Sequence, residues 1–257
     1  MTGTMTDKEM LFEYVLRLAD DHLVLAHRLS EWCGHAPMLE EDLALPNIAL
    51  DLLGQARALY TYAGEIEGEG RGEDQLAYLR PEHEYRNLLL LELDNGDFAR
   101  TMLRLYLFAA FMELFWEAML SSKDEMLAAI AAKAIKETRY HVRHSAEWVI
   151  RLGDGTAESA RRMNEALEDL QPYCSELFET DSVTAFVAKQ GIGVDPATLE
   201  AAWQADIAKI FREARLNGDT LADGYQTGGR SGQHTEAMGY LLADLQYMQR
   251  AYPGMEW

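Results

Sequence analysis

The stretch from Ala132 to Trp148, AKAIKETRYHVRHSAEW, carries the residue types best suited to chemistry. Steps of three and four residues place His141 on one face of a helix. Glu137 lies one turn before His141, and an imidazole with a nearby carboxylate is a candidate pair of metal ligands. The alternative is a histidine that is hydrogen-bonded within the core. The stripe that contains it comprises Ile130, Ala134, Thr138, His141, Ser145, Trp148 and Leu152.

A comparison with the ligand pattern of two-iron helical bundles favours an incomplete site. Such bundles take one carboxylate from each of two helices and a Glu-x-x-His pair from each of the other two. Three residues before His141 the chain has Thr138, and Glu137 stands four residues before it. On the second helix Leu52 and Gln55 occupy the equivalent depth. A leucine has no lone pair to offer a metal, so no Glu-x-x-His pair forms there.

The remaining two helices also lack the carboxylate that each should supply to a two-iron site. The first helix offers His22, and the third offers Ala109 with Glu113 one turn further along. A complete two-iron site needs about six ligands, and this chain presents one or two. The sequence therefore predicts no metal site in this chain, with Glu137 and His141 as the residual candidates.

No other catalytic constellation is visible. The two cysteines, Cys33 and Cys174, have neither CxxC spacing nor a partner histidine at a recognisable distance in sequence. The glycine-rich segment 67–74 lacks the spacing of a phosphate-binding loop and is predicted as a surface loop. The sequence His-Thr-Glu at His234–Glu236 is consistent with a helix N-terminus capped by Thr235.

Helical periodicity accounts for most of the chain. The first helix is predicted over residues 7–32, with the buried stripe Leu11, Val15, Leu18, His22, Leu25, Leu29 and Trp32. Further helices are predicted over 43–67, 98–121 and 123–152, with Pro46 in the first turn of the second and Ser122 as the N-cap of the fourth. Later helices are predicted over 156–178, where Pro172 kinks or ends the helix, then over 181–190, 196–216 and 234–251. No convincing strand appears.

Four long helices with short connections predict an all-α fold, an up-down antiparallel bundle. The bundle core is expected over about 7–153, and accessory helices over about 156–257 pack on it. A single domain of residues 1–257 is the expected organisation.

Charge and composition exclude several classes of function. The net charge of −20 repels nucleic acid and anionic membranes, so neither is an expected partner. The most apolar stretch, 103–120, carries Arg104, Glu113 and Glu117, which argues against a membrane span. The first residues, MTGTMTDKEM, do not have the pattern of a secretory signal. A cytoplasmic location is expected.

Several segments resemble one known family, the C subunits of the ring-1,2-phenylacetyl-CoA epoxidases, which are multicomponent oxygenases of phenylacetate degradation. The resemblance spans nearly the whole chain. The segments that carry it are EWCGHAP (31–37), NIALDLLGQAR (47–57), NGDFA (95–99), KAIKETRYHVRHS (133–145), RLGDGT (151–156), QTGG (226–229) and the tail from His234 to Trp257.

The resemblance implies a ferritin-like helical bundle. In this family the paralogous A subunit holds the di-iron centre that epoxidises the phenyl ring of phenylacetyl-CoA, and the C subunit pairs with it. A reductase subunit supplies electrons through flavin and an iron–sulfur centre. When the ligand pattern of the catalytic paralogue is laid on this chain, only His141 matches among the six positions, which are His22, Leu52, Gln55, Ala109, Thr138 and His141.

The expected function is that of a non-catalytic structural subunit of the epoxidase. It has no cofactor of its own, pairs with the catalytic A subunit in a hetero-oligomer, and has the reductase as a further candidate partner. His141 is then the remnant of a metal site, hydrogen-bonded to Gln55 or Glu137. Two alternatives are an atypical metal-dependent oxidase that uses Glu137 and His141, and a free-standing helical binding module.

Overall fold

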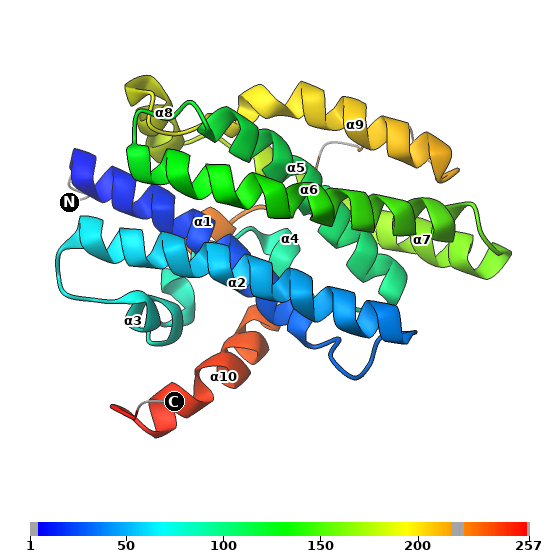
Figure 1. Ribbon diagram of the computed structural model, residues 1–257, viewed down its shortest axis with the longest axis horizontal. Coiled ribbons are helices and arrows are strands. Elements are labelled where there is room, and N and C mark those ends of the chain that lie inside the picture. The colour runs from blue at the N-terminus through cyan, green and yellow to red at the C-terminus, as the bar shows by residue number, and fades with distance from the viewer. Residues whose placement is uncertain (1–4, 217–220, 222–223, 256–257) are drawn as a thin grey trace. The chain divides into compact units, whose positions relative to one another are not determined.

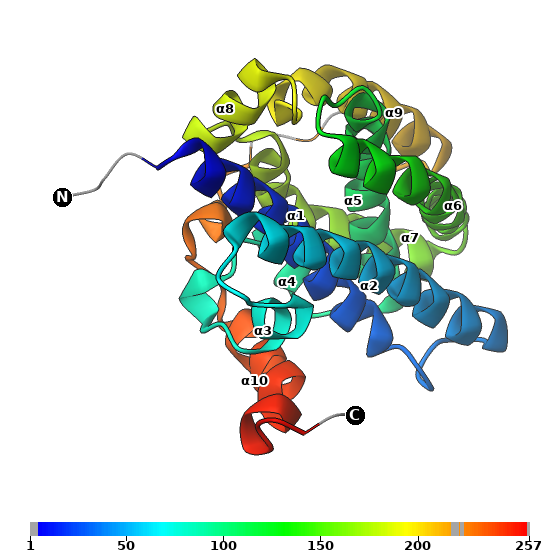
Figure 2. The same ribbon diagram turned by 60° about the vertical axis from the view of Figure 1, so that its left-hand side comes forward.

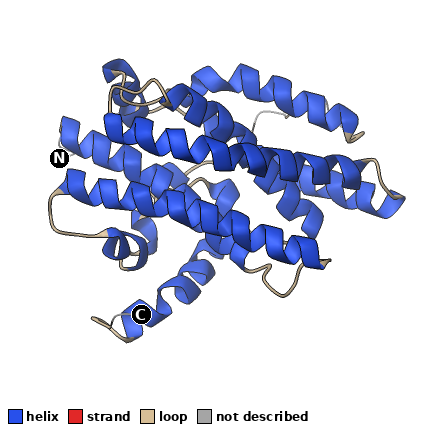
Figure 3. Cartoon of the chain, viewed as in Figure 1, coloured by secondary structure: helices blue, strands red, loops and turns tan. Residues whose placement is uncertain are grey.

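The computed structural model describes residues 5–216, 221 and 224–255. Within these ranges the regular structure is entirely helical and contains no strand (Figure 3). The predicted all-α, ferritin-like fold class is confirmed. No helix in the described ranges is both long and apolar enough to cross a membrane.

The helices fall into two compact units. Unit 1 comprises Met1–Asp94 and Gly228–Trp257, and unit 2 comprises Asn95–Thr227. The helices of unit 1 are α1 (Asp7–Ser30), α2 (Leu39–Glu67), α3 (Glu73–Tyr78), η1 (Glu82–Glu84), α4 (Leu89–Glu92), η4 (Gly229–Ser231) and α10 (Glu236–Ala251). Those of unit 2 are α5 (Phe98–Met119), α6 (Glu125–Gly153), α7 (Ala157–Leu170), η2 (Gln171–Phe178), α8 (Ser182–Gln190), η3 (Pro196–Leu199) and α9 (Glu200–Glu213).

In unit 1, α1 and α2 form an antiparallel pair of long helices (Figure 1). A capping box starts α1: the Thr6 hydroxyl accepts from the backbone N–H of Glu9, and the Glu9 carboxylate accepts from the backbone N–H of Thr6. The predicted stripe of α1 is buried from Val15 to Leu29. The first helix is thus close to its predicted range and ends two residues earlier, at Ser30.

The prediction that Pro46 occupies the first turn of the second helix is wrong. The helix α2 begins at Leu39, and Pro46 lies inside it. Three acidic residues, Glu40, Glu41 and Asp42, fill the first turn and interact favourably with the positive end of the helix dipole. This stabilisation allows the helix to start before the proline. Pro46 is half-buried and has no backbone N–H, so it cannot donate to the carbonyl of Asp42.

In unit 2, α5 and α6 form a second antiparallel pair (Figure 1). Asp97 caps α5, and the N-cap of α6 is Asp124 and not the predicted Ser122. The Asp124 carboxylate accepts from the backbone N–H groups of Met126 and Leu127, both at 3.0 Å. The Ser122 hydroxyl instead donates to the carbonyl of Ile192 at 2.8 Å. A carboxylate adds a charge–dipole interaction that a hydroxyl lacks, which explains why Asp124 rather than Ser122 caps α6.

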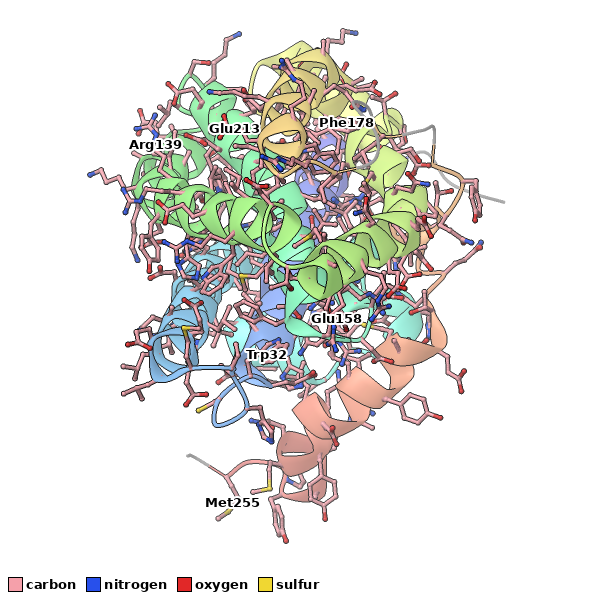
Figure 4. The ribbon with its side chains drawn as sticks, turned by 90° about the vertical axis from the view of Figure 1, so that its right-hand side faces the viewer. Trp32, Arg139, Glu158, Phe178, Glu213 and Met255 are labelled. Atoms are coloured by element: carbon pink, nitrogen blue, oxygen red, sulfur yellow. The ribbon has the colours of Figure 1, made fainter. Side chains whose placement is uncertain are left out.

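The later helices of unit 2 cover α5, whose sequence is apolar on several faces. Contacts come from α6, α7 and α9. Trp203 on α9 donates its indole N–H to the carbonyl of Leu107 at 3.0 Å. Phe178, which Figure 4 labels, packs edge-on against Phe111 and Trp203 with ring centroids 5.7 and 5.1 Å apart. As predicted from Pro172, α7 ends early, at Leu170, and continues as the 3₁₀ helix η2.

The last helix, α10, belongs to unit 1. It lies on the side formed by α3 and α4 and extends away from α1 and α2 (Figure 2). Met238, Leu241 and Leu242 bury one of its faces. Residues up to Met255 follow it at the far end of the chain (Figure 4).

Candidate functional site

Unit 1 holds three of the predicted ligand positions, His22, Leu52 and Gln55, and all three are buried. The Nδ1 atom of His22 lies 2.7 Å from the carbonyl oxygen of Leu18, one turn earlier. Because a carbonyl can only accept, Nδ1 carries a proton and donates to it. One of the two ring nitrogens that could bind a metal is therefore committed to the helix backbone.

Unit 2 holds the other positions. Ala109, Thr138 and His141 are buried, as the helical periodicity predicted. Glu137 differs from them, because 22% of its side chain is exposed and its carboxylate lies 3.8 Å from the ammonium of Lys133. The two residual candidates for metal binding thus have different surroundings, one in the core and one at the edge of the helix.

The donor chemistry of these six positions does not fit a di-iron centre. Leu52 and Ala109 carry no donor atom, and Gln55 offers an amide where iron sites use carboxylate or imidazole. Across the residues with described coordinates, no group of three or more His, Cys, Asp or Glu side chains is arranged to hold a metal ion. That this chain binds no metal stays a prediction, as does the hydrogen bond expected between His141 and Gln55 or Glu137.

A buried charge network in unit 1 was missed by sequence reasoning. Its first centre is Asp20 on α1, which has no exposed side-chain area. The Asp20 carboxylate accepts from the guanidinium of Arg80, from the Tyr60 hydroxyl at 2.5 Å and from the backbone N–H of Arg86 at 2.8 Å. The Arg80 guanidinium in turn lies 4.2 Å from the ring centroid of Tyr85. Burial raises the pKa of Tyr85 to about 12, so this phenol stays protonated at neutral pH.

The second centre is the neighbouring Asp21. Arg230, from the C-terminal part of the chain, donates to both carboxylate oxygens at 3.0 and 2.8 Å. The same guanidinium donates to the carbonyl of Arg86 at 2.6 Å, and the backbone N–H of Leu88 donates to Asp21 at 2.8 Å. Burial raises the pKa of Asp21 above its ordinary value, and the charge of Arg230 opposes that shift.

The third centre is Glu92 on α4, which is fully buried. Its carboxylate lies 2.7 Å from Nδ1 of His234, and it accepts from the backbone N–H of Thr235 at 2.5 Å and from the Asn87 amide at 2.9 Å. Further along α10, Gln246 donates to the carbonyl of Arg80 at 2.9 Å.

One signal in the sequence could have indicated this network. Asp20 and Asp21 stand in the middle of the buried part of a helix, between Leu18 and Leu25. A buried carboxylate requires a compensating charge, so the pair predicts cationic partners. Local periodicity does not say which of the chain's arginines they are.

The role of this charge network is structural rather than catalytic. Its carboxylates are enclosed and already engaged by arginine, histidine, tyrosine or backbone donors, so none is placed to act on a bound substrate. Its members lie far apart in sequence, from Asp20 to Gln246. Its evident effect is to hold the C-terminal residues of the chain against α1 and α4.

Comparison with known proteins supplies the family context. Residues 2–257 match the family described as "Phenylacetic acid catabolic protein". Among characterised proteins, the chain is 50% identical over 247 residues to the C subunit of the 1,2-phenylacetyl-CoA epoxidase of Escherichia coli strain K12. That match covers 96% of this chain and 99% of the Escherichia coli protein.

Proposed function

The chain belongs to the phenylacetic acid catabolic protein family, and we propose that it is the non-catalytic, structural subunit of a phenylacetyl-CoA epoxidase. In this role it pairs with the di-iron catalytic subunit, while a reductase supplies electrons through its own flavin and iron–sulfur centre. It acts in the cytoplasm in the aerobic degradation of phenylacetate. The relative in Escherichia coli is named as one subunit of such an epoxidase, which makes partner subunits an expected part of the function.

The observation that carries this proposal is the chemistry of the six ligand positions. An aliphatic leucine stands at position 52 and an alanine at position 109, where a di-iron centre requires oxygen or nitrogen donors. These two residues leave too few ligands for two irons, even if His22, Thr138 and His141 were all able to bind.

The outward face of α2 supports pairing with another subunit. Leu39, Leu43 and Leu50 share one stripe of this helix and are 69, 59 and 64% exposed; we call them the α2 leucine stripe. The opposite face of α2 is buried. A helix that is apolar on two faces is typical of an element covered by a partner.

Metal analysis tests the non-catalytic role. The isolated chain, purified after expression with added iron, is expected to contain only traces of iron, while the complex that it forms with its catalytic partner should hold iron in proportion to that partner. Stoichiometric iron in the isolated chain would contradict the proposal.

Substitution of the leucine stripe tests the pairing. The double variant Leu43→Glu, Leu50→Glu is expected to lose co-purification with the catalytic subunit, because two carboxylates would be buried without partners. Leu79→Glu is the matched control, since Leu79 is also exposed in unit 1 but lies outside α2. Equal co-purification of both variants would show that α2 does not face the partner.

Two other functions remain distinguishable by these experiments. An oxidase that uses Glu137 and His141 would consume oxygen in a metal-dependent manner as an isolated chain. A free-standing binding module would be free of iron and would not co-purify with the catalytic subunit. Neither is favoured, because Glu137 is engaged with Lys133 at the helix edge and the family resemblance is to an epoxidase subunit.

A further inference from the structure

We propose that residues 228–255, here called the C-terminal arm, are held on unit 1 by a protonated His234, so that the arm is a latch that loosens as the pH rises. The arm consists of η4, α10 and their flanking residues. The inference concerns unit 1 alone and is independent of the function proposed above.

The geometry at His234 accommodates two protons on the ring. Its side chain has no exposed area. Nδ1 lies 2.7 Å from a carboxylate oxygen of Glu92, and Nε2 lies 3.1 Å from the carbonyl oxygen of Tyr85. The Tyr85 carbonyl can only accept, and the Glu92 carboxylate accepts when it is ionised; toward these two acceptors, only the imidazolium form donates from both nitrogens. A neutral ring would direct one lone pair at an oxygen.

Glu92 links this charge to the docking of the arm. Its carboxylate is hydrogen-bonded to the His234 ring and to the backbone N–H of Thr235. These two residues are consecutive and lie at the start of α10. The Asn87 amide donates to the same carboxylate. Because Glu92 is fully buried, loss of the imidazolium would leave its negative charge without a cation bonded to its carboxylate, which is costly in the protein interior.

Arginines and carboxylates make up most of the other charged groups around the arm. Arg28 of α1 donates to the backbone carbonyls of Glu92 and Ala237, and Arg230 pairs with Asp21; arginine stays charged throughout. Glu82 of η1 adds negative charge near His234. Other charged or titratable groups near the arm, among the described residues, include the exposed His83 of η1, whose backbone carbonyl lies beside Gly232. They also include Arg17, Arg80, Arg86, Asp20 and Glu13, together with Asp244, Arg250 and Glu236 on the arm itself.

A second histidine, His27 of α1, also faces α10. Burial lowers its pKa, an effect that the charges of Glu31 and Asp244 partly oppose. His27 therefore loses its proton at lower pH than His234. It does not contribute to loosening on the alkaline side.

The direction of the pH effect follows from the pKa of His234. Burial lowers it, but the hydrogen bond and charge of Glu92, with the Tyr85 carbonyl and Glu82, together raise it above its ordinary value. A raised pKa in the folded state means that the stabilisation is fully present below the unfolded value of about 6.5 and is lost as the pH rises through the folded value. The arm is thus held in acid and loosened in alkali.

The rest of the arm limits how far it loosens. Gln246 donates to the Arg80 carbonyl and to the Tyr85 hydroxyl, both at 2.9 Å, and Arg250 donates to the Arg80 carbonyl at 3.1 Å. These bonds do not depend on His234. Deprotonation is therefore expected to open the start of α10 rather than to unfold unit 1.

Hydrogen exchange on the full chain tests the latch. Protection of peptides that cover the start of α10, corrected for the intrinsic rate, is expected to fall by at least about 10-fold between about pH 6 and pH 9, in the range where a raised histidine pKa lies. Peptides from α5 and α6 serve as the internal reference. Protection of the arm that stays constant over this range would overturn the proposal.

Variants separate the latch from general instability. His234→Gln removes the charge, and the start of α10 is expected to be weakly protected at every pH. His35→Gln is the control, since His35 is an exposed histidine outside the arm, and it should retain the pH dependence. If His234→Gln does not fold, nitrogen-15 NMR of the wild-type histidine rings decides the matter: two protonated ring nitrogens on His234 at about pH 6 support the latch, and one overturns it.

Discussion

Asp20 and Arg80 form a deeply buried ion pair of the described network, with side chains 0 and 3% exposed. Taking both charges out of water is costly, and their hydrogen bonds to Tyr60, Arg86 and each other offset that cost. Such a pair is sensitive to the removal of one member, because the remaining charge cannot be hydrated.

Arg80→Met is therefore expected to lower the free energy of unfolding by about 3–5 kcal/mol. Urea unfolding followed by circular dichroism measures the loss. Adding Asp20→Asn should recover much of it, since asparagine is neutral and still accepts hydrogen bonds. Arg57→Met is the control: Arg57 is 75% exposed and its ion pair with Glu73 is worth about 1 kcal/mol or less. Equal effects of Arg80→Met and Arg57→Met would contradict the assignment.

The two cysteines should differ in reactivity. Cys33 is exposed, whereas Cys174 is buried and burial raises its pKa to about 12. The thiolate is the reactive form, so a thiol-specific reagent should modify one cysteine of the native chain at about pH 8 and both in denaturant. Mass spectrometry should locate the first adduct at Cys33, and rapid modification of native Cys174 would refute this expectation.

At the scale of elements, close helix packing depends on a glycine. A Cβ atom added to Gly153, at the end of α6, would overlap the backbone carbonyl of Ala214, just after α9. Gly239 lies inside α10, where an added Cβ would meet only a side-chain oxygen of Glu82 at 3.4 Å. The same substitution is therefore expected to have opposite effects in the two helices.

Gly153→Ala should destabilise the chain by about 1–3 kcal/mol, because the backbone of one helix end must move. Gly239→Ala should stabilise it by about 0.5–1 kcal/mol through helix propensity. Thermal unfolding of the two variants against wild type gives the comparison. A stabilising Gly153→Ala would mean that α6 and α9 are not packed this closely.

At the scale of the whole molecule, the net charge of −20 produces self-repulsion in the compact state. Raising the ionic strength from about 0.01 to about 0.15 M shortens the Debye length from about 30 to about 8 Å, which screens charges at the surface but not buried pairs. The melting temperature of the isolated chain is therefore expected to rise with sodium chloride over this range. A melting temperature that falls would indicate that attractive surface ion pairs dominate.

The sequence by itself determined the helices and their buried faces. Repeats of three and four residues predicted that His22 and His141 are buried, and the residue types at positions 52 and 109 predicted too few metal ligands. These properties are local, because a helix fixes which residues share a face. The precise starts of α2 and α6 were less predictable, since competing caps and first-turn acids differ little in energy.

Only the tertiary structure decided which charges meet. Asp20 pairs with Arg80, Asp21 with Arg230 and Glu92 with His234, over separations of 60, 209 and 142 residues. The sequence contains many more carboxylates than these, and no periodic pattern selects among the possible pairs. The selection comes from burial: once α1 and α4 are enclosed, only a cation that reaches them through the fold can compensate their charge. That requirement, rather than any local motif, places the C-terminal arm on unit 1.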